Sequence, residues 1–395
     1  MRVLSKAKRK IPLRIAVMIL LSVLCSAAVL CNSFIPQSFA DKYSTNVFPV
    51  VSMLMQNVNM FFQYSLTENA IICLAPLAVI GLVIWLVVLV KKILGHGALI
   101  YLYKSFRDVL ILVLIAAVIF QAMHGFNYRR THVTDELELV GDELTYDDYC
   151  KALTWAYQGM IEARSHLGED YNGVAHLSES FENTSAYANE LLNSFSEEYD
   201  IPLSRNFVRA KPVSLSHYWS YTYIVGMYDP YLAEANVNTD YISACEFPIT
   251  VCHELSHAKG YASETDCNTL ATLACCCSDR ADFRYAGFYE IFWNLYSVTE
   301  GIGDQIGEVP PQFGATKEME PVYRDMRASS LYWEGIDKEI EEIKQMLGID
   351  IAEASNTVND AFLKTNGETG VDSYVVPDSS YVRFYLTYFK GDQDA

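Results

Sequence analysis

Two histidines and a glutamate within one short apolar run have the spacing of a metal-dependent hydrolase. In this HExxH pattern His253 and His257 are four residues apart, so on a helix both imidazoles project from one face and can reach one tetrahedral metal ion. Glu254 lies beside the first histidine without being a ligand, which suits a general base that takes a proton from a metal-activated water. Because the neighbouring residues are nearly all uncharged, the pattern predicts a buried Zn²⁺ site with Glu254 as its catalytic residue.

The third protein ligand is expected from one of two carboxylates that follow this helix. Gly260 is suited to end the first helix and Ser263 to begin a second one, which would carry Glu264 back past the histidines. Asp266 is the alternative ligand, although Ser263-x-x-Asp266 also approximates a capping box. The spacing of Glu264 and Asn268 resembles the second-helix signature of zinc peptidases that use two histidines and one glutamate. This resemblance implies that Glu264 binds the metal and that Asn268 orients a histidine from the second shell.

The first third of the chain is apolar and predicts membrane helices. The chain is 51% hydrophobic and its mean hydropathy is positive, although its net charge is −19. Three runs, at about residues 13–31, 70–90 and 109–126, are long enough to cross a hydrocarbon core about 30 Å thick. The first run could instead be a cleaved signal peptide, because basic residues precede it and small residues lie near its end.

Basic residues set the expected orientation of these runs. Lysine and arginine gather in the first ten residues and again between the second and third runs, as at Lys91 and Lys92. Since cytoplasmic loops carry the excess of positive charge, both segments are expected inside the cell and the chain after Phe126 outside it. The expected localisation is a plasma membrane crossed several times, with the metal motif in an extracytoplasmic domain.

Nearly all acidic residues lie in that outer portion. Of the 48 aspartates and glutamates, only Asp41, Glu68 and Asp108 precede residue 126. So acidic a surface repels phosphate backbones, which excludes nucleic acid as a partner. The expected partners are the lipid bilayer, through the three membrane helices, and a peptide or protein substrate.

The expected organisation is a membrane domain over residues 1–126, an acidic linker over 127–148 and one outer domain over 149–395. Helical periodicity covers most of the outer domain, and a stretch rich in tyrosine and valine before the metal helix predicts a small sheet. The predicted fold class is therefore a membrane-anchored protein with a mainly α (α+β) outer domain.

The tail of that predicted sheet is a candidate for substrate binding. In HExxH peptidases a sheet edge just before the metal helix commonly pairs with an extended substrate by strand addition. The residues of this chain at that place are Ala235, Asn236, Val237 and Asn238.

Several segments resemble the DUF3810 family of bacterial membrane proteins. Besides the metal motif, the resemblance is carried by KYSTNVFPVV, YSLTE, HGFNYRR, GMYDPYLAEANVN and VNDAFLKTNGETGVDSY, and it extends over nearly the full chain. It implies a bacterial source, an uncleaved first span and a zincin-like, zinc-peptidase domain. The family run that corresponds to residues 264–268 usually reads EDEAN. Glu264 and Asn268 match it while Asp266 does not, which favours Glu264 as the ligand.

Two functions are compatible with these features. The first is a membrane-anchored zinc metallopeptidase in which Glu254 acts as base and later as acid. The second is a zinc-containing receptor or scaffold with a structural metal; such a site has no need of Glu254, so its presence favours the peptidase. The side chains chemically able to stabilise a reacting oxyanion include His217, Tyr218, Tyr261 and Tyr289.

Overall fold

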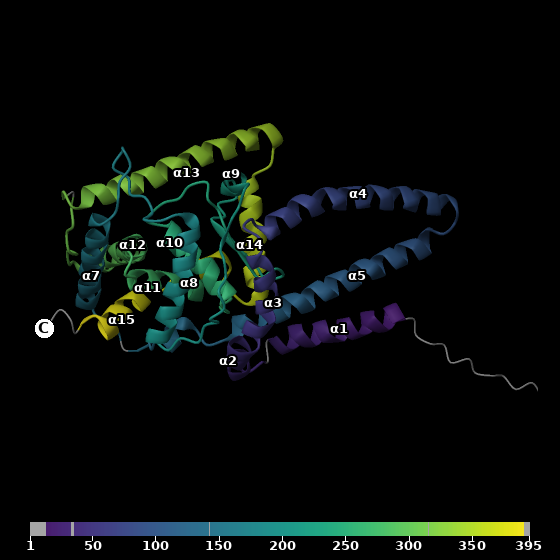
Figure 1. Cartoon of the computed structure of the whole chain (residues 1–395), viewed down its shortest axis with the longest axis horizontal. Coiled ribbons are helices and arrows are strands. Elements are labelled where there is room, and N and C mark those ends of the chain that lie inside the picture. The colour runs from purple at the N-terminus through teal and green to yellow at the C-terminus, as the bar shows by residue number, and fades with distance from the viewer. Residues whose placement is uncertain (1–12, 33–34, 142, 315, 391–395) are drawn as a thin grey trace, which may run out of the picture.

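The chain is mainly helical, as the sequence predicts, with one small sheet (Figure 1). The structure is a computed structural model that describes residues 13–32, 35–141, 143–314 and 316–390. The basic residues at the start of the chain, on which part of the predicted orientation depends, lie outside the described residues.

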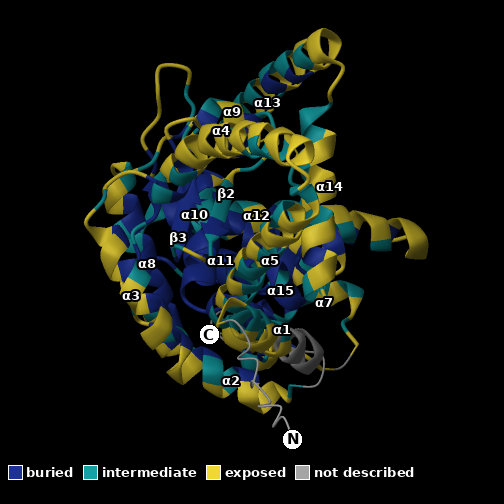
Figure 2. Cartoon of the chain, turned by 90° about the vertical axis from the view of Figure 1, so that its right-hand side faces the viewer, coloured by how far each residue is buried: buried dark blue, intermediate teal, exposed yellow. Residues whose placement is uncertain are grey.

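Among the described residues, two helices are long and apolar enough to cross a membrane. They are α4 (Leu66–Leu94) and α5 (Ala98–Met123), which project from the rest of the molecule as an antiparallel pair (Figure 1). The most apolar stretch of α4 has no buried residue, so protein does not cover it (Figure 2). α1 (Leu13–Asn32) packs on α5, and its described apolar stretch, Leu13–Leu24, is shorter. Length and composition thus support the second and third predicted spans.

The segments around the base of this hairpin pack onto the outer domain. They are α2 (Gln37–Asn46), α3 (Phe48–Met60), η1 (Gly125–Arg129) and α6 (Val133–Glu136). Val133 and Leu137 are fully buried in the main core, although acidic residues surround them in sequence. The stretch predicted as an acidic linker is therefore packed structure over at least residues 127–139, in which Asp135 and Glu138 are exposed and Arg130 is buried.

The outer domain is built from helices around α10 and α11, which are almost entirely buried (Figure 2). Its α7 starts with a capping box between Thr145 and Asp148 and packs along α12. The helices are α7 (Tyr146–Ser165), α8 (Phe181–Glu198), α9 (Ser216–Ser220), α10 (Phe247–Ala258), α11 (Glu264–Cys276), α12 (Ala281–Ile306), α13 (Met319–Leu347), α14 (Ile351–Asn366), η2 (Gly370–Tyr374) and α15 (Asp378–Tyr388).

The sheet has three short strands in the order β1-β3-β2. β1 (Lys211–Pro212) runs parallel to β3 (Glu234–Val237), and β2 (Gly226–Asp229) runs antiparallel to it. β3 is therefore the central strand, and all four of its residues are buried.

Side chains of the sheet hold the start of the long apolar helix α4. The Glu234 carboxylate accepts hydrogen bonds from the backbone N–H groups of Leu66 (3.1 Å) and Thr67 (2.8 Å), which have no partner within the helix. Lys211 is fully buried, and its Nζ donates to the carbonyl oxygens of Asn59 (2.9 Å) and Tyr64 (3.3 Å) in the segment before α4. The base of the hairpin is thus tied to both β1 and β3.

Candidate metal centre

The metal helix α10 ends where the sequence predicts. Gly260 has a φ of +107°, which an L side chain rarely adopts, and its N–H donates to the carbonyl oxygen of His257 at 3.1 Å. A Cβ at Gly260 would also lie 3.2 Å from the Phe48 ring of α3, so these two elements approach closely. The chain then turns directly into α11.

Lys259, the one charged side chain in this turn, is buried with three oxygen acceptors. Its Nζ donates to Asn193 Oδ1 (2.9 Å) and to the carbonyl oxygens of Ser204 (3.2 Å) and Asn206 (3.1 Å). Burial lowers the pKa of Lys259 to about 8. Lys259 thus ties the end of α10 to the preceding loop and does not enter the metal site.

Three ligand atoms converge between α10 and α11. The Nε2 atoms of His253 and His257 are 3.1 Å apart, and Glu264 Oε2 lies 3.1 Å from the first and 3.3 Å from the second. All three side chains are buried, and their ligand atoms lie within 4.8 Å of one another. The turn at Gly260 produces this arrangement, because it brings the first residue of α11 back against the histidine face of α10.

The Nδ1 atoms of both histidines are held by hydrogen bonds to neighbouring acceptors. His253 Nδ1 lies 2.6 Å from Asn268 Oδ1, and His257 Nδ1 lies 3.0 Å from the carbonyl oxygen of Tyr261. Since both partners accept hydrogen bonds, each Nδ1 carries the proton and each Nε2 presents a lone pair to the centre. Metal-bound histidines are oriented in this way.

The resulting centre fits a divalent cation. Two imidazole lone pairs and a carboxylate face one point, where acceptors alone repel one another unless a cation or a proton lies between them. Glu264 Oε2 is correspondingly among the buried polar atoms without a hydrogen-bond partner. Burial alone would raise the pKa of Glu264, but the two nearby histidines hold it well below its usual range. Two nitrogens and one carboxylate oxygen are a ligand set that Zn²⁺ accepts in open sites.

Glu254 lies beside this centre with a free carboxylate oxygen. Its Oε2 is buried and has no hydrogen-bond partner, and burial, assisted by the charge of Glu264, raises its pKa to about 8. Strand β2 passes directly over it, since a Cβ at Gly226 would lie only 2.3 Å from Glu254 Oε1. Glycine at this position gives the Glu254 carboxylate its space.

Asp266, the alternative ligand, points to a different part of the molecule. Its carboxylate lies 3.0 Å from His132 Nδ1 and accepts the backbone N–H of Val133 at 2.9 Å. The capping box is not formed either, because Ser263 occupies the N-cap position of α11 without a side-chain cap bond. Asp266 thus anchors α6 to α11, and of the two predicted carboxylates only Glu264 joins the histidines.

The predicted substrate edge is corrected by the order of the strands. Ala235, Asn236 and Val237 belong to the central strand β3, which β1 and β2 pair from both sides, and Asn238 donates its N–H to the carbonyl oxygen of Val225 (2.9 Å). No side of β3 is left for an added strand. The open edge next to the metal helix belongs to β2. Backbone groups alternate in direction along a strand, so the N–H and C=O groups of its residues 226 and 228 point away from β3.

Sequence reasoning missed Tyr374, which comes from η2. Its ring stacks beside His253, with centroids 6.3 Å apart and planes at 24°, and its hydroxyl accepts a hydrogen bond from Asn359 Nδ2 at 3.4 Å. Asn268 Nδ2 donates to the Tyr374 carbonyl oxygen at 2.6 Å, so α11 also fixes the backbone of this residue. Burial, followed by the charge of Glu264, raises the pKa of the Tyr374 hydroxyl.

Two further residues reach the site from the segment that follows the long apolar helix α5. The His124 ring lies 5.7 Å from the His257 ring, and Tyr128 lies 5.1 Å from His124. His124 Nδ1 and the Tyr128 hydroxyl are buried without hydrogen-bond partners. The signal for these residues and for Tyr374 was present, since they fall in the HGFNYRR and VNDAFLKTNGETGVDSY segments that carry the DUF3810 resemblance.

The four side chains predicted as possible oxyanion stabilisers have other positions. His217 lies within 3.0 Å of both Asp240 and Glu339, and the Tyr218 ring is beside it. Tyr289 packs in α12. The carbonyl oxygen of Tyr261 accepts a hydrogen bond from His257 Nδ1, and the Arg130 guanidinium group lies over the Tyr261 ring. Of these four residues, Tyr261 alone contacts a metal-binding side chain, and it does so through its backbone.

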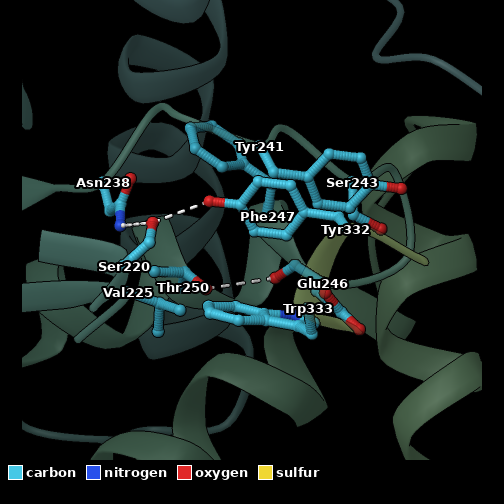
Figure 3. Close-up of a pocket in the computed structure, with 10 residues that line it drawn as sticks. All are labelled: Ser220, Val225, Asn238, Tyr241, Ser243, Glu246, Phe247, Thr250, Tyr332 and Trp333. Atoms are coloured by element: carbon cyan, nitrogen blue, oxygen red, sulfur yellow. Dashed lines mark hydrogen bonds between the residues drawn. The ribbon is translucent and has the colours of Figure 1, made fainter. Parts of the chain in front are cut away.

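A small hollow lies at the start of α10, between β2, β3 and α13 (Figure 3). Its volume of about 40 Å³ holds one or two water molecules, which is too small for a substrate side chain of ordinary size. It is lined by Ser220, Val225, Asn238, Tyr241, Ser243, Glu246, Phe247, Thr250, Tyr332 and Trp333.

Comparison with known proteins agrees with the resemblance in the sequence. No curated protein and no solved structure matches the chain. The profile of one family, described as protein of unknown function (DUF3810), matches residues 43–376 and so covers α3, the membrane hairpin, the sheet and every residue of the candidate metal centre. The chain therefore belongs to the DUF3810 family.

Proposed function

We propose that this chain is a membrane-anchored zinc metallopeptidase that hydrolyses peptide bonds of a protein or peptide substrate. The observation that carries the proposal is the convergence of His253, His257 and Glu264 beside Glu254, whose carboxylate has a free buried oxygen. A structural metal site would be closed by a fourth protein ligand and would gain nothing from a neighbouring base.

The chain's own groups have a distinct task in each step. A zinc ion held by the three ligands would polarise the attacking water and the scissile carbonyl group. Glu254 Oε2 accepts the proton of that water and then returns it to the departing amine, as acid–base catalysis requires. The Tyr374 ring stacks beside His253, so its hydroxyl would donate to the oxygen that gains negative charge.

The substrate is placed against the edge of β2. An extended peptide can pair with the outward N–H and C=O groups of Gly226 and Tyr228, which brings it across the face of α10. The ring of Tyr228 stacks on His257 from the same side, with centroids 6.0 Å apart. Strand pairing would thus align a peptide bond beside the ligands without a deep pocket.

The proposed location is the outer face of a bacterial plasma membrane. Lys91 and Lys92 lie at the far end of the α4–α5 hairpin, so the positive-inside rule assigns that end to the cytoplasm. The other end joins the domain that holds the candidate metal centre, so that domain would lie outside. α1 would add a third span and make the protein multi-pass with its domain extracytoplasmic.

The deciding experiment compares Glu254→Gln with the wild-type full chain in zinc content and peptide-library cleavage. Glutamine keeps the size of the side chain but cannot take the proton, so cleavage should fall by about 10²–10⁴ while zinc stays bound. Glu162→Gln on the exposed surface of α7 makes the same chemical change and should leave both unchanged. If zinc binds but neither wild type nor variant cleaves any peptide, the metal is structural and the chain is a zinc-containing receptor or scaffold.

A further inference from the structure

The helix α3 is amphipathic in the reverse sense of a soluble helix. Three of its polar residues, Ser52, Gln56 and Asn59, are buried, whereas most of its apolar side chains face outward; Phe48 at its start is the buried apolar exception, and Asn57 is an exposed polar one. The range 48–62 contains no charged residue. The outward apolar residues, with their exposed fractions, are Val50 (63%), Val51 (39%), Met53 (43%), Leu54 (66%), Val58 (43%) and Met60 (42%). A helix with this pattern is stable against lipid and unfavourable against water.

The polar face of α3 is fastened to the elements that carry the site. Gln56 Nε2 donates to the carbonyl oxygen of Ala258 at 3.0 Å, and Ala258 is the last residue of the metal helix α10. Asn59 Nδ2 donates to the carbonyl oxygen of Leu232, in the turn between β2 and β3. A displacement of α3 would therefore move both the metal helix and the edge strand.

α3 lies beside the base of the membrane hairpin. It leads into α4 after five residues, and it lies across the direction of α4 and α5 at the hairpin end of the domain (Figures 1 and 2). On the other side of the hairpin α14 also leaves apolar side chains exposed, namely Val358 (71%) and Phe362 (42%). The Phe362 ring is 5.9 Å from Phe120 of α5, so this surface continues into the membrane helix.

We propose that α3 lies in the surface of the bilayer with its apolar face among the acyl chains, and that it holds the candidate metal centre there. Its 13 residues extend about 20 Å, less than the roughly 30 Å needed to span, so it lies along the surface. The substrate, which rests on the proposed peptidase function, is then a membrane-anchored polypeptide cut in the segment that emerges from the bilayer. A soluble peptide lacks the anchor that would concentrate it at this surface.

The position of α3 can be tested without any assay of activity. The full chain is reconstituted in vesicles of phosphatidylethanolamine and phosphatidylglycerol with a photo-crosslinking amino acid at Leu54. Its matched control is Leu331, which is also exposed (54%) and belongs to α13, the helix that runs along the top of the domain in Figure 1. Lipid adducts are expected at 54 and not at 331. Adducts to a second copy of the chain at 54, or none at all, would overturn the lipid-facing assignment.

The substrate class is tested with one randomised peptide cassette in three settings. The cassette is placed directly after a transmembrane helix, after a long Gly/Ser spacer on the same helix, or in solution, and is incubated with zinc-loaded vesicles. Cutting of the adjacent cassette at least about tenfold faster than of the other two is expected. Equal rates in all three settings would overturn the substrate class. Lipid adducts at 54 with no cutting anywhere would refute the peptidase function and leave the position of α3 intact.

Discussion

At the scale of single residues, the two candidate carboxylates of α11 have separate tasks that mutation can distinguish. Glu264→Ala removes an atom about 3 Å from both histidine Nε2 atoms, so zinc affinity should fall by at least 10-fold, as losing a ligand requires. Asp266→Ala removes only the partner of His132 and Val133, and should lower stability while zinc affinity stays close to wild type. Competition with a chelator measures the first effect and thermal unfolding the second. The reverse order of zinc affinities would make Asp266 the ligand.

The His132–Asp266 pair also predicts a pH dependence. The hydrogen bond to Asp266 raises the pKa of His132 to about 9 from 6.5. A raised histidine pKa stabilises the folded state fully below pH 6.5, and this contribution is lost as the pH rises through about 9. The melting temperature of the wild type should therefore fall between pH 6.5 and about 9, and His132→Gln should flatten this fall. His166→Gln, at another exposed histidine, should keep the wild-type fall, and a flat wild-type profile would contradict the assignment.

How much of the site can be predicted from the sequence depends on how far apart its residues lie along the chain. His253, Glu254, His257 and Glu264 occupy one helix and the next turn, so helical spacing and two turn residues suffice to bring them together. His124 and Tyr374 join from more than 100 residues away on either side. Their positions depend on the packing of α5 and η2, which no local pattern encodes.

At the scale of secondary-structure elements, β2 can be tested through its glycine. A Cβ at Gly226 would lie 2.3 Å from Glu254 Oε1, so Gly226→Ala should displace that carboxylate and reduce cleavage by at least 10-fold while zinc remains. Gly301→Ala in α12 is the matched control, because a Cβ there meets no atom within 4 Å. It should raise stability by roughly 0.5–1 kcal/mol through helix propensity and leave cleavage unchanged. Full activity of the Gly226 variant would show that β2 does not limit Glu254.

The helices could be predicted from the sequence, whereas the order of the strands in the sheet could not. Helices make up most of the outer domain, as expected, because their apolar periodicity extends over three or more turns. The strands have only two to four residues, and the sequence places Ala235 to Val237 nearest the metal helix along the chain. Which strand becomes the edge is decided by β1, whose two residues pair with β3 from its other side.

At the scale of the whole molecule, reporter fusions test the predicted orientation in the membrane. A reporter fused after Ala395 should be active only outside the cytoplasm, because the basic end of the hairpin belongs inside. A second reporter inserted at Gly95, in the turn between α4 and α5, should show the opposite behaviour. Activity of the first reporter in the cytoplasm would reverse the orientation.

The buried Lys211 determines when this protein can finish folding. Its carbonyl partners precede it by about 150 residues, and Gln56 precedes its partner Ala258 by 202. The ribosome therefore releases α3 and the hairpin well before the strands and α10 exist. In the proposed topology, insertion would come first, and the rest of the domain would close afterwards onto a segment already held at the bilayer. A fragment begun after the hairpin would bury the Lys211 ammonium group without the oxygens of Asn59 and Tyr64 that satisfy it.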